Sequence, residues 1–378
     1  MKIIITVSND IVTDQRIRRM SMALREEGYY ICIVGRQLGS DLPLSDADKY
    51  KRFRMIFKKG VLFYMFLNIR LFLYLLWNKA DAIIPVDLDT LLPAVLIRKI
   101  KGSRIIYDAH EYFTGVPELR DRNFVRLIWK RIERFSFRYI ESMITVNDSI
   151  AKIFYNEYSI MPCVVRNIVE NNDKATIKRS ELGILESDLF LVMQGSINMD
   201  RGLLEAIKAI AIINSESRLI GQALVKLLII GSGYELTLLK KYVEDNDLKE
   251  EIMFLDRMEW TTMMSYTRSA DAGLSIDGSN CINYNYSLPN KIFEYIKSHI
   301  AIIATSLPEI EKIILKHNCG VLLNDNSVNS VYKAISKLNQ DRVLLKDLKQ
   351  NSKIAAAEYT WEMESRKLKD YINQSLLS

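Results

Sequence analysis

The sequence predicts an α/β protein built from two doubly wound, parallel-sheet domains. Its 378 residues are enough for about two domains, at roughly 100–200 residues per domain. Hydrophobic residues make up 49% of the chain and charged residues 26%, close to the averages of soluble globular proteins. This composition excludes a disordered chain, a collagen-like repeat and a polytopic membrane protein. Short apolar runs alternate with stretches of helical periodicity, which is typical of parallel strands covered by helices on both faces.

The expected strands fall into two groups, separated by a less regular stretch over residues 161–186. The first group comprises Ile3–Val7, Tyr30–Val34, Ala82–Val86, Arg104–Tyr107 and Ser142–Val146. The second comprises Leu189–Gln194, Lys226–Ile230, Ile252–Leu255, Ala272–Ser275, Ala301–Ala304 and Val321–Leu323. We therefore expect two domains that join near Arg166–Asn167. Ligands of open α/β sheets bind outside the carboxyl ends of the strands, so two such domains facing each other predict a site in a cleft.

The first helix follows from local signals. Asp14 can cap the orphan amides of the next turn, and Ile17, Met20 and Leu24 continue at helical spacing. Gly28 then ends the helix before the next strand. The first two strands and this helix are therefore predicted to form a βαβ unit.

Cysteine usage and charge indicate the compartment and the partners. The four cysteines form no C-x-x-C pair and the chain has only three histidines, which argues against a zinc site and a disulfide framework. The first ten residues carry too short an apolar run for a signal peptide, so we expect a protein of the reducing cytoplasm. Residues 1–165 hold 26 Lys and Arg against 18 Asp and Glu, a net charge of +8 that indicates an anionic surface or ligand.

Two stretches combine basic and bulky apolar residues. The apolar run 61–77 is interrupted by Asn68 and Arg70, and an Arg at the bilayer centre costs roughly 2.5–3.5 kcal/mol, so we do not expect a membrane span. The basic residues before it are Lys51, Arg52, Arg54, Lys58 and Lys59, interleaved with Phe53, Met55 and Phe57. The stretch 120–139 carries Arg120, Arg122, Arg126, Lys130, Arg131, Arg134 and Arg138. Either the two stretches lie on an anionic membrane, or both are amphipathic helices packed on the sheet with solvated charges.

Glycines follow two of the expected strands. Gly195 to Gly202 precede a helix that starts near Leu203, and Gly231 and Gly233 follow a second strand. Glycines at such turns let backbone amides approach a phosphate at a helix N-terminus, and Arg201 would add a charge-assisted contact. Neither segment spells G-x-G-x-x-G or a P-loop, so the nicotinamide and P-loop interpretations fail. Tight packing turns remain the alternative.

Two further segments carry polar side chains at expected strand ends or helix starts. His110, between Asp108 and Glu111, can orient a hydroxyl, accept its proton or contact a sugar, or it is purely structural. Lys291 and Glu294 lie at i, i+3 on one face of an expected helix, where a carboxylate can accept hydrogen bonds from a ribose diol. A plain cap is the alternative, because Ser287 and Asn290 are both available for it.

The combination of segments resembles a known family. Stretches at 8–29, 86–94, 105–113, 144–151, 164–170, 194–207 (QGSINMDRGLLEAI), 227–233, 270–276 and 288–310 (LPNKIFEYIKSHIAIIATSLPEI) match its pattern in order over nearly the whole chain. The sequence is thus similar to the retaining, nucleotide-sugar-dependent glycosyltransferases of the GT-B fold, in particular glycosyltransferase family 4 of bacterial surface-polysaccharide clusters.

The resemblance implies two Rossmann-like domains facing across a cleft. Residues 1–166 would bind the acceptor and 167–357 the nucleotide sugar, and the helix within 358–378 would cross back to the first domain. Glu294 would hold the donor ribose, His110 would meet the donor sugar, and the residues of the diphosphate and nucleotide loops would be Gly195, Arg201, Gly231 and Gly233. We infer a diphosphate contact for Lys291 from its place beside Glu294, and we add the adjoining Ser196 and Asn290 to the predicted donor-binding residues. As catalytic residues we predict His110, Arg201 and Glu294.

The chain departs from the family pattern at two positions. Tyr286 stands where the first Glu of a Glu, seven residues, Glu pattern is common, so a carboxylate that contacts the donor sugar is missing. Ser196 stands where an Arg commonly follows the glycine of the diphosphate loop, which leaves Arg201 as the evident cation.

The resemblance implies transfer with retention, in which the leaving diphosphate helps to deprotonate the incoming hydroxyl. We expect no metal and no other cofactor, and we discount the match to D-x-D at Asp87-Leu-Asp89 because it lies in the acceptor half. The expected partners are a UDP-linked donor, a lipid-linked saccharide acceptor and the anionic inner face of the plasma membrane. The alternatives are a catalytically inert sugar-nucleotide or membrane-binding protein and a nucleotide-sugar 2-epimerase. Nucleic acid is disfavoured because the chain has no recognised binding module.

Overall fold

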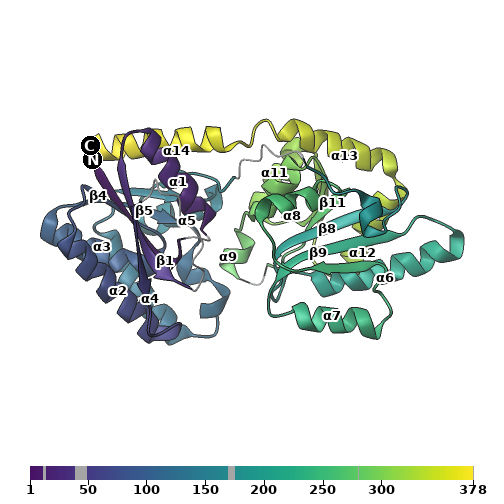
Figure 1. The fold of residues 1–378 in the computed structure, drawn as a ribbon, viewed down its shortest axis with the longest axis horizontal. Helices are drawn as coiled ribbons and strands as arrows, with labels where there is room; N and C mark the ends of the chain where they lie inside the picture. The colour runs from purple at the N-terminus through teal and green to yellow at the C-terminus, as the bar shows by residue number, and fades with distance from the viewer. Residues whose placement is uncertain (12–13, 39–48, 169–174, 280, 378) are drawn as a thin grey trace. The chain divides into compact units, whose positions relative to one another are not determined.

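The computed structural model describes residues 1–11, 14–38, 49–168, 175–279 and 281–377 (Figure 1). The chain forms two compact units. Unit 1 comprises residues 1–167, 281–283 and 362–378, and unit 2 comprises residues 168–280 and 284–361. Residues 12–13 of the stretch 8–29 and residues 169–170 of the stretch 164–170 lie outside the described residues.

Unit 1 is built on a seven-stranded parallel sheet in the order β3-β2-β1-β4-β5-β6-β7. Apolar residues fill the central strands, because helices cover both faces of the sheet. Its strands are β1 (Lys2–Asp10), β2 (Tyr30–Gln37), β3 (Lys49–Arg54), β4 (Ala82–Pro85), β5 (Arg104–Ala109), β6 (Ser142–Thr145) and β7 (Cys163–Val164). Its helices are α1 (Gln15–Glu26), α2 (Gly60–Trp77), α3 (Leu88–Lys101), η1 (Phe113–Gly115), η2 (Pro117–Leu119), α4 (Asn123–Phe137), α5 (Asp148–Tyr158) and α14 (Trp361–Leu377), whose first residue belongs to unit 2.

The predicted start, apolar face and end of the first helix, α1, are confirmed. The Asp14 side chain accepts a hydrogen bond of 3.1 Å from the Ile17 amide, and Ile17, Met20 and Leu24 are buried. Gly28 has a φ of +84°, which ends the helix at little steric cost.

The C-terminal helix α14 packs on unit 1. The Met143 amide at β6 donates to the Tyr371 hydroxyl at 2.8 Å, and Lys369 pairs with Glu26 of α1. Leu368 and Ile372 are buried in this contact. Figure 1 shows α14 and α1 above the sheet, with α2, α3 and α4 below it.

Unit 2 is built on a six-stranded parallel sheet in the order β10-β9-β8-β11-β12-β13. Its strands are β8 (Leu189–Ser196), β9 (Val225–Ser232), β10 (Ile252–Leu255), β11 (Ala272–Ser275), β12 (Ala301–Thr305) and β13 (Gly320–Leu323). Its helices are η3 (Arg179–Leu182), α6 (Leu203–Ile220), α7 (Leu236–Asp245), α8 (Trp260–Thr267), α9 (Ile282–Asn285, shared with unit 1), α10 (Asn290–Lys297), α11 (Pro308–His317), α12 (Val328–Gln340) and α13 (Arg342–Ala355).

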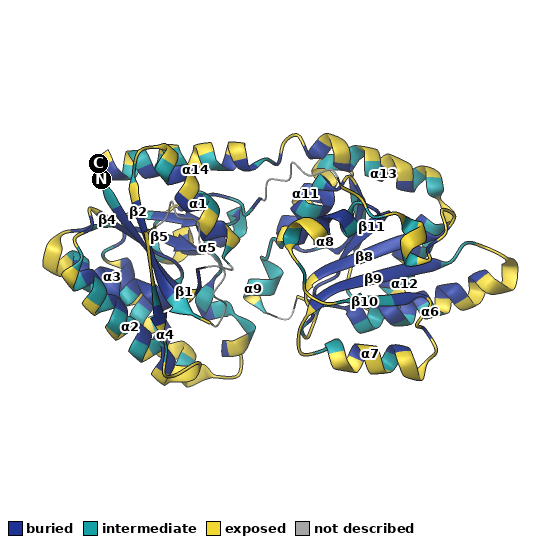
Figure 2. Cartoon of the chain, in the orientation of Figure 1, coloured by how far each residue is buried: buried dark blue, intermediate teal, exposed yellow. Residues whose placement is uncertain are grey.

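Strand alternation divides the core of unit 2 into two layers. In β8, Leu191 and Met193 pack with α6, α7 and α12, whereas Phe190 and Val192 pack with α10 and α11. Both sets are buried because each strand is covered on both faces, and Figure 2 shows β8 and β9 dark blue along most of their length. The predicted fold class of two Rossmann-like, parallel-sheet α/β domains is confirmed.

One part of the stretch 50–79 is a strand instead of a helix. Lys49–Arg54 forms β3 at the edge of the unit 1 sheet, where Phe53 is buried and Arg52 pairs with the buried carboxylate of Asp10 at 3.0 Å. An edge strand has only one neighbour, and charged side chains at such an edge deter further strand pairing. The basic residues at 51–54 therefore belong to an edge strand and not to an amphipathic helix. The later parts of the two stretches do form helices, which are α2 and α4.

Candidate functional site

Glu294 lies on α10, where a network of side chains holds its carboxylate. The Trp260 indole N–H donates to Glu294 Oε1 at 2.8 Å, and the Gln194 amide donates to Oε2. The Thr267 hydroxyl donates to the Gln194 carbonyl oxygen and thereby sets the orientation of that amide. These contacts fix the orientation of the Glu294 carboxylate, a group whose oxygens act as hydrogen-bond acceptors.

Arg201 and Lys291 share one buried carboxylate. Arg201 Nη1 lies 2.9 Å from Asp277 Oδ2, and Lys291 Nζ lies 3.7 Å from Asp277 Oδ1. Asp277 is 0% exposed and follows the carboxyl end of β11 by two residues. Burial lowers the pKa of the Lys291 ammonium, and the charge of Asp277 opposes that effect. The Arg201 guanidinium also lies 5.1 Å from the centre of the Tyr284 ring. The result is a fixed pair of cationic groups beside one carboxylate.

The predicted glycines have different physical roles. Gly195 and Gly231 are paired residues of β8 and β9, so they lie in the strand ends instead of in a turn. A Cβ on Gly231 would lie 1.9 Å from the Gly195 carbonyl oxygen, and one on Gly233 would lie 2.0 Å from the Ile197 carbonyl oxygen. Close backbone packing explains these two glycines. Gly195 has a φ of +111° and open space around its Cα, which leaves room for a ligand.

The N-terminus of α6 follows this loop. Gly202 is its N-cap residue, with a φ of +66°, and no side chain caps the first turn. The first amides of a helix lack intrahelical partners and carry a partial positive charge, so they can bind an anion. Ser196 is exposed at the start of the loop, and its hydroxyl oxygen accepts a hydrogen bond of 2.7 Å from Asn198. Asn290 is an exposed residue at the start of α10, and neither it nor Ser287 caps that helix with its side chain.

His110 lies in unit 1, just beyond the end of β5. Its Nε2 lies 2.9 Å from Asp108 Oδ2, and its amide donates to Asp87 Oδ1 at 2.9 Å. Asp108 is buried and also pairs with Arg16 at 2.9 Å. Burial alone would lower the pKa of His110, but the carboxylates of Asp108 and Asp87 raise it to about 9. At neutral pH the ring is therefore protonated and serves as a hydrogen-bond donor instead of a proton acceptor.

The structure thus distributes the predicted residues between the units. The residues at 195–201, 231–233 and 290–294 come from unit 2, where they follow carboxyl ends of its strands or lie on α10, and His110 comes from unit 1. Sequence reasoning missed Gln194, Trp260 and Asp277. Asp277 carries a recognisable signal, because it lies two residues beyond the end of an apolar strand. Trp260 carries none, since its contact with Glu294 depends on how α8 packs against α10.

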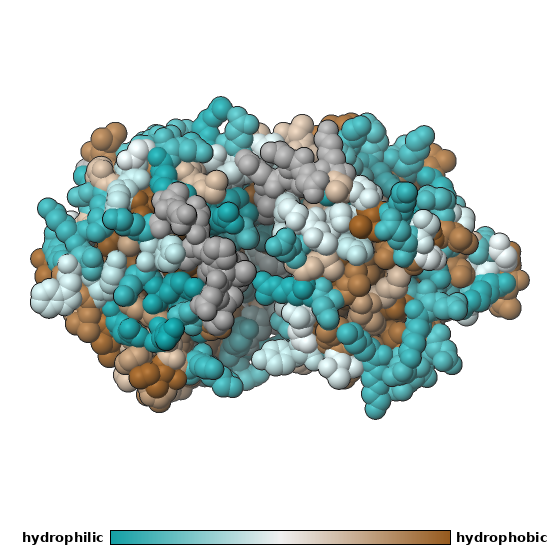
Figure 3. Space-filling view, in the orientation of Figure 1, coloured by the Kyte–Doolittle hydropathy of each residue, from teal (hydrophilic) through white to brown (hydrophobic). Residues whose placement is uncertain are grey.

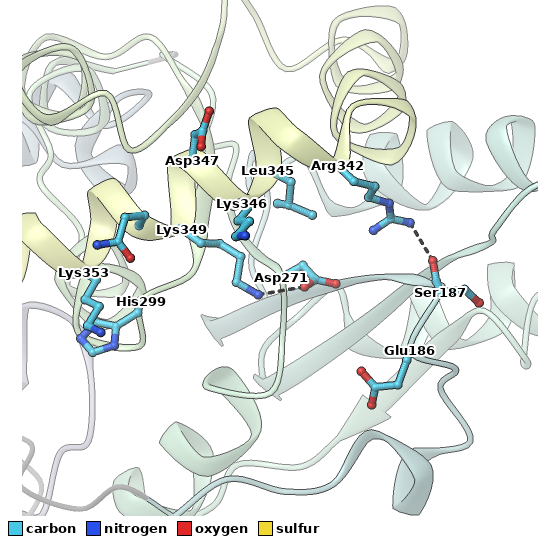
Figure 4. A pocket seen from close by; sticks show the side chains of 11 residues that line it. Glu186, Ser187, Asp271, His299, Arg342, Leu345, Lys346, Asp347, Lys349 and Lys353 are labelled. Atoms are coloured by element: carbon cyan, nitrogen blue, oxygen red, sulfur yellow. Dashed lines mark hydrogen bonds and ion pairs between the residues drawn. The ribbon is translucent and has the colours of Figure 1, made fainter.

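A pocket of about 950 Å³ lies elsewhere in unit 2 (Figure 4). It is next to the amino ends of β8 and β11, the opposite sheet edge from Arg201 and Asp277. Asp271 at its base accepts hydrogen bonds from Arg179 at 2.8 Å and Lys349 at 2.9 Å. The Lys349 contact ties α13, and the Arg179 contact ties η3, to the residue before β11, so both have a structural role.

The described part of the chain contains no group of three or more His, Cys, Asp or Glu residues placed to hold a metal ion. The four cysteines, all among the described residues, form no disulfide, and Cys32 and Cys319 are buried.

Comparison with known proteins identifies a domain in unit 2. Residues 174–355 match the family Glycosyl transferases group 1. No curated protein sequence matches the chain.

Solved structures share the fold along the whole chain. The sucrose-phosphate synthase of Thermosynechococcus elongatus has a TM-score of 0.79 at 14% identity, covering 99% of this chain and 98% of that one. HepE of Anabaena in complex with UDP has a TM-score of 0.75 at 13% identity, covering 99% and 100%. WaaG, a glycosyltransferase involved in lipopolysaccharide biosynthesis, has a TM-score of 0.72 at 15% identity, covering 97% and 98%. These neighbours place the chain in the GT-B fold class.

Proposed function

We propose that the protein is a metal-independent, retaining glycosyltransferase of family 4 type that transfers a sugar from a UDP-linked donor to a hydroxyl group. One observation carries this proposal: a glycosyltransferase group 1 domain presents the held Glu294 carboxylate together with the Arg201 and Lys291 cations around Asp277. A carboxylate for a diol and two cations for a diphosphate match the two ends of a nucleoside diphosphate. UDP is proposed as the nucleotide because HepE was solved with UDP bound.

Donor binding divides among the named groups. We assign to the Glu294 carboxylate the hydrogen bonds from the two ribose hydroxyls, while Trp260 and Gln194 keep the carboxylate in place. Arg201, Lys291 and the uncapped amides of α6 stabilise the diphosphate. Because Asp277 already orients both cations, little reorganisation is needed when the donor binds.

In the transfer step, the bond between the anomeric carbon and the diphosphate oxygen breaks, and its electron pair stays on the diphosphate. The acceptor hydroxyl bonds to the anomeric carbon on the same face, and its proton passes to the leaving phosphate oxygen. Negative charge grows on the diphosphate during this step, so Arg201 and the α6 N-terminus stabilise the transition state more than the ground state.

His110 acts as a hydrogen-bond donor in this proposal. Its ring is protonated at neutral pH, with Nε2 engaged by Asp108, so it does not take the acceptor proton. A cationic donor suits contact with a sugar hydroxyl. We assign to it the positioning of the transferred sugar.

The acceptor is proposed to be a lipid-linked saccharide in bacterial surface-polysaccharide biosynthesis, met at the cytoplasmic side of the plasma membrane. Two features support this assignment. Residues 1–165 carry a net charge of +8, which favours an anionic lipid diphosphate or membrane. Cysteines that form no disulfide fit a reducing compartment.

A panel of nucleotide sugars, with thermal unfolding and slow hydrolysis as readouts, tests the donor assignment. A donor at 100 times its dissociation constant adds about 2.7 kcal/mol to the free energy of unfolding, which raises Tm measurably. Glu294→Gln should abolish the shift for UDP-linked donors, whereas the exposed control Glu181→Gln should retain it. If no nucleotide sugar binds or turns over and Glu294→Gln matches the parent, the proposal is wrong.

The same panel separates the alternatives. Binding without transfer or hydrolysis indicates an inert sugar-nucleotide protein. Conversion of a donor to its 2-epimer indicates an epimerase. Transfer that persists with excess chelator supports the metal-independent step, and its loss would contradict that part of the proposal.

A further inference from the structure

We propose that unit 1 docks on a lipid bilayer with anionic headgroups through a surface formed by α2, the start of α4 and the segment 54–59. We call this surface the α2–α4 face. It extends the proposed function, because a lipid-linked acceptor is met at a bilayer. The evidence for it lies in unit 1 alone, so it can fail while nucleotide-sugar transfer by the protein holds.

The outward side of α2 is apolar along its whole length. Six residues at near-helical spacing are exposed, and all are apolar: Val61, Leu62, Met65, Ile69, Leu73 and Trp77. Trp77, at the end of the helix, is 82% exposed. Soluble proteins rarely expose contiguous apolar surface of this kind unless it binds a partner or a membrane. Figure 3 shows brown side chains at the lower left margin of unit 1, where Figure 1 draws α2.

The two polar residues that interrupt α2 in the sequence do not interrupt this stripe. The Asn68 side chain donates to the carbonyl oxygens of Tyr64 and Asp89, at 2.8 Å each. The Arg70 guanidinium lies 4.6 Å from the centre of the Phe53 ring and donates to the Arg54 carbonyl oxygen. Both polar groups are therefore turned away from the exposed stripe.

Apolar side chains beside α2 extend the surface. On α4, Phe124 is 75% exposed, and Leu127 and Ile128 are also exposed. The start of α4 lies beside α2, because the rings of Trp129 and Tyr64 are in edge contact with 5.2 Å between centres. Ile56 and Phe57 are exposed just before α2, and the Phe57 ring meets the Phe66 ring of α2.

Basic residues accompany these apolar side chains. Lys58 and Lys59 are exposed immediately before α2, with Arg54 nearby in sequence. The exposed basic residues before and along α4 are Arg120, Arg122, Arg126, Arg131 and Arg134. Bulky apolar groups that enter the acyl boundary, combined with Lys and Arg that meet headgroup phosphates, match an anionic bilayer. An anionic bilayer attracts these basic residues, whereas a second copy of the same basic face would repel them. The charge therefore favours a bilayer as the partner.

The mode of contact is peripheral. Among the described residues, α2 is the one helix long and apolar enough to cross a membrane by length and composition. Its other side, however, is committed to the protein: Phe63, Leu67, Leu71 and Leu75 are buried at every fourth position and α2 packs on α3. A span would remove these four side chains from the core, so the helix lies in the plane of the membrane.

Co-sedimentation of the full chain with vesicles tests the proposal. The parent should bind vesicles of phosphatidylcholine mixed with phosphatidylglycerol, bind pure phosphatidylcholine far less, and lose binding as salt rises. Lys58→Glu combined with Lys59→Glu should lower the partition coefficient about tenfold or more. Met65→Ser combined with Ile69→Ser and Leu73→Ser should lower it by a similar factor, about tenfold.

Matched controls come from exposed positions of unit 2. Lys240→Glu with Lys241→Glu repeats the charge change on α7, and Ile212→Ser with Leu219→Ser and Ile220→Ser repeats the apolar change on α6. These controls should bind as the parent does, and all variants should keep the parent's UDP-induced thermal shift. The proposal is overturned if the parent does not sediment with anionic vesicles at low salt, or if both α2–α4 face variants bind like their controls. Self-association through this face without vesicle binding would also overturn it.

Discussion

Arg201 Nη1 and Asp277 Oδ2 lie 2.9 Å apart, in an ion pair whose carboxylate is fully buried. Lys291 shares the same carboxylate from α10, 14 positions further along the chain. A buried carboxylate between two cations keeps their mutual repulsion low and holds them in one geometry before any ligand arrives. Contacts of this kind lead to four predictions, which concern Asp277, Trp260, His110 and Ile372.

Asp277→Asn should lower the free energy of unfolding of unit 2 by about 3 kcal/mol, because it leaves two cationic groups without their buried partner. UDP should recover part of the loss, since its diphosphate returns negative charge to the same cations. Urea denaturation with and without UDP measures both effects. The exposed control Asp256→Asn should stay within about 0.5 kcal/mol of the parent. Equal stability of the two variants would refute the buried-pair argument.

Trp260→Phe should raise the dissociation constant of UDP about tenfold, because the Glu294 carboxylate loses a charge-assisted hydrogen bond that orients it. The ring stays, so packing of α8 against α10 changes little. Isothermal titration calorimetry provides the measurement. Trp77→Phe, at an exposed position of unit 1, should leave the constant unchanged. An unchanged affinity in the Trp260 variant would show that Gln194 alone orients the carboxylate.

His110 should make stability depend on pH on the alkaline side. Burial lowers its pKa, but Asp108 and Asp87 raise it to about 9, above the unfolded value of about 6.5. Its contribution is therefore fully present below pH 6.5 and is lost as pH rises toward 9. The difference in unfolding free energy between the parent and His110→Gln should shrink by about 2–3 kcal/mol across that window. Urea denaturation at a series of pH values measures it, and a difference that stays constant with pH would contradict a protonated ring.

Ile372→Ala should destabilise unit 1 by about 3 kcal/mol, because Ile372 is completely buried where α14 packs on this unit. Urea denaturation followed through tryptophan fluorescence measures the loss, with Trp77 and Trp129 in unit 1 and Trp260 and Trp361 in unit 2. Met363→Ala on the exposed side of α14 should change stability by less than about 0.5 kcal/mol. If Ile372→Ala lowers the free energy of unfolding no more than Met363→Ala does, α14 contributes little to the stability of unit 1.

Sequence periodicity predicted the central strands well, because a strand covered on both faces is a continuous apolar run. It missed β3, where Phe53 is the single buried residue among charged neighbours, and the two-residue β7. The family resemblance implies a nucleotide-lining turn at Gly231 and Gly233, and the structure shows that the lack of a side chain there also permits close backbone packing between β8, β9 and the loop at Ile197. A glycine pattern cannot by itself separate these two causes, since both exclude a Cβ.

The sequence by itself determined the type and order of most elements and the segments that follow the carboxyl ends of the strands. These properties depend on local periodicity, caps and turn residues, which neighbours along the chain decide. Only the tertiary structure decided that Trp260 orients Glu294, that Asp277 joins Arg201 to Lys291, and that Asn68 and Arg70 turn away from the exposed side of α2. Each of these depends on side chains from different elements meeting as the core packs, and no local pattern specifies such a meeting.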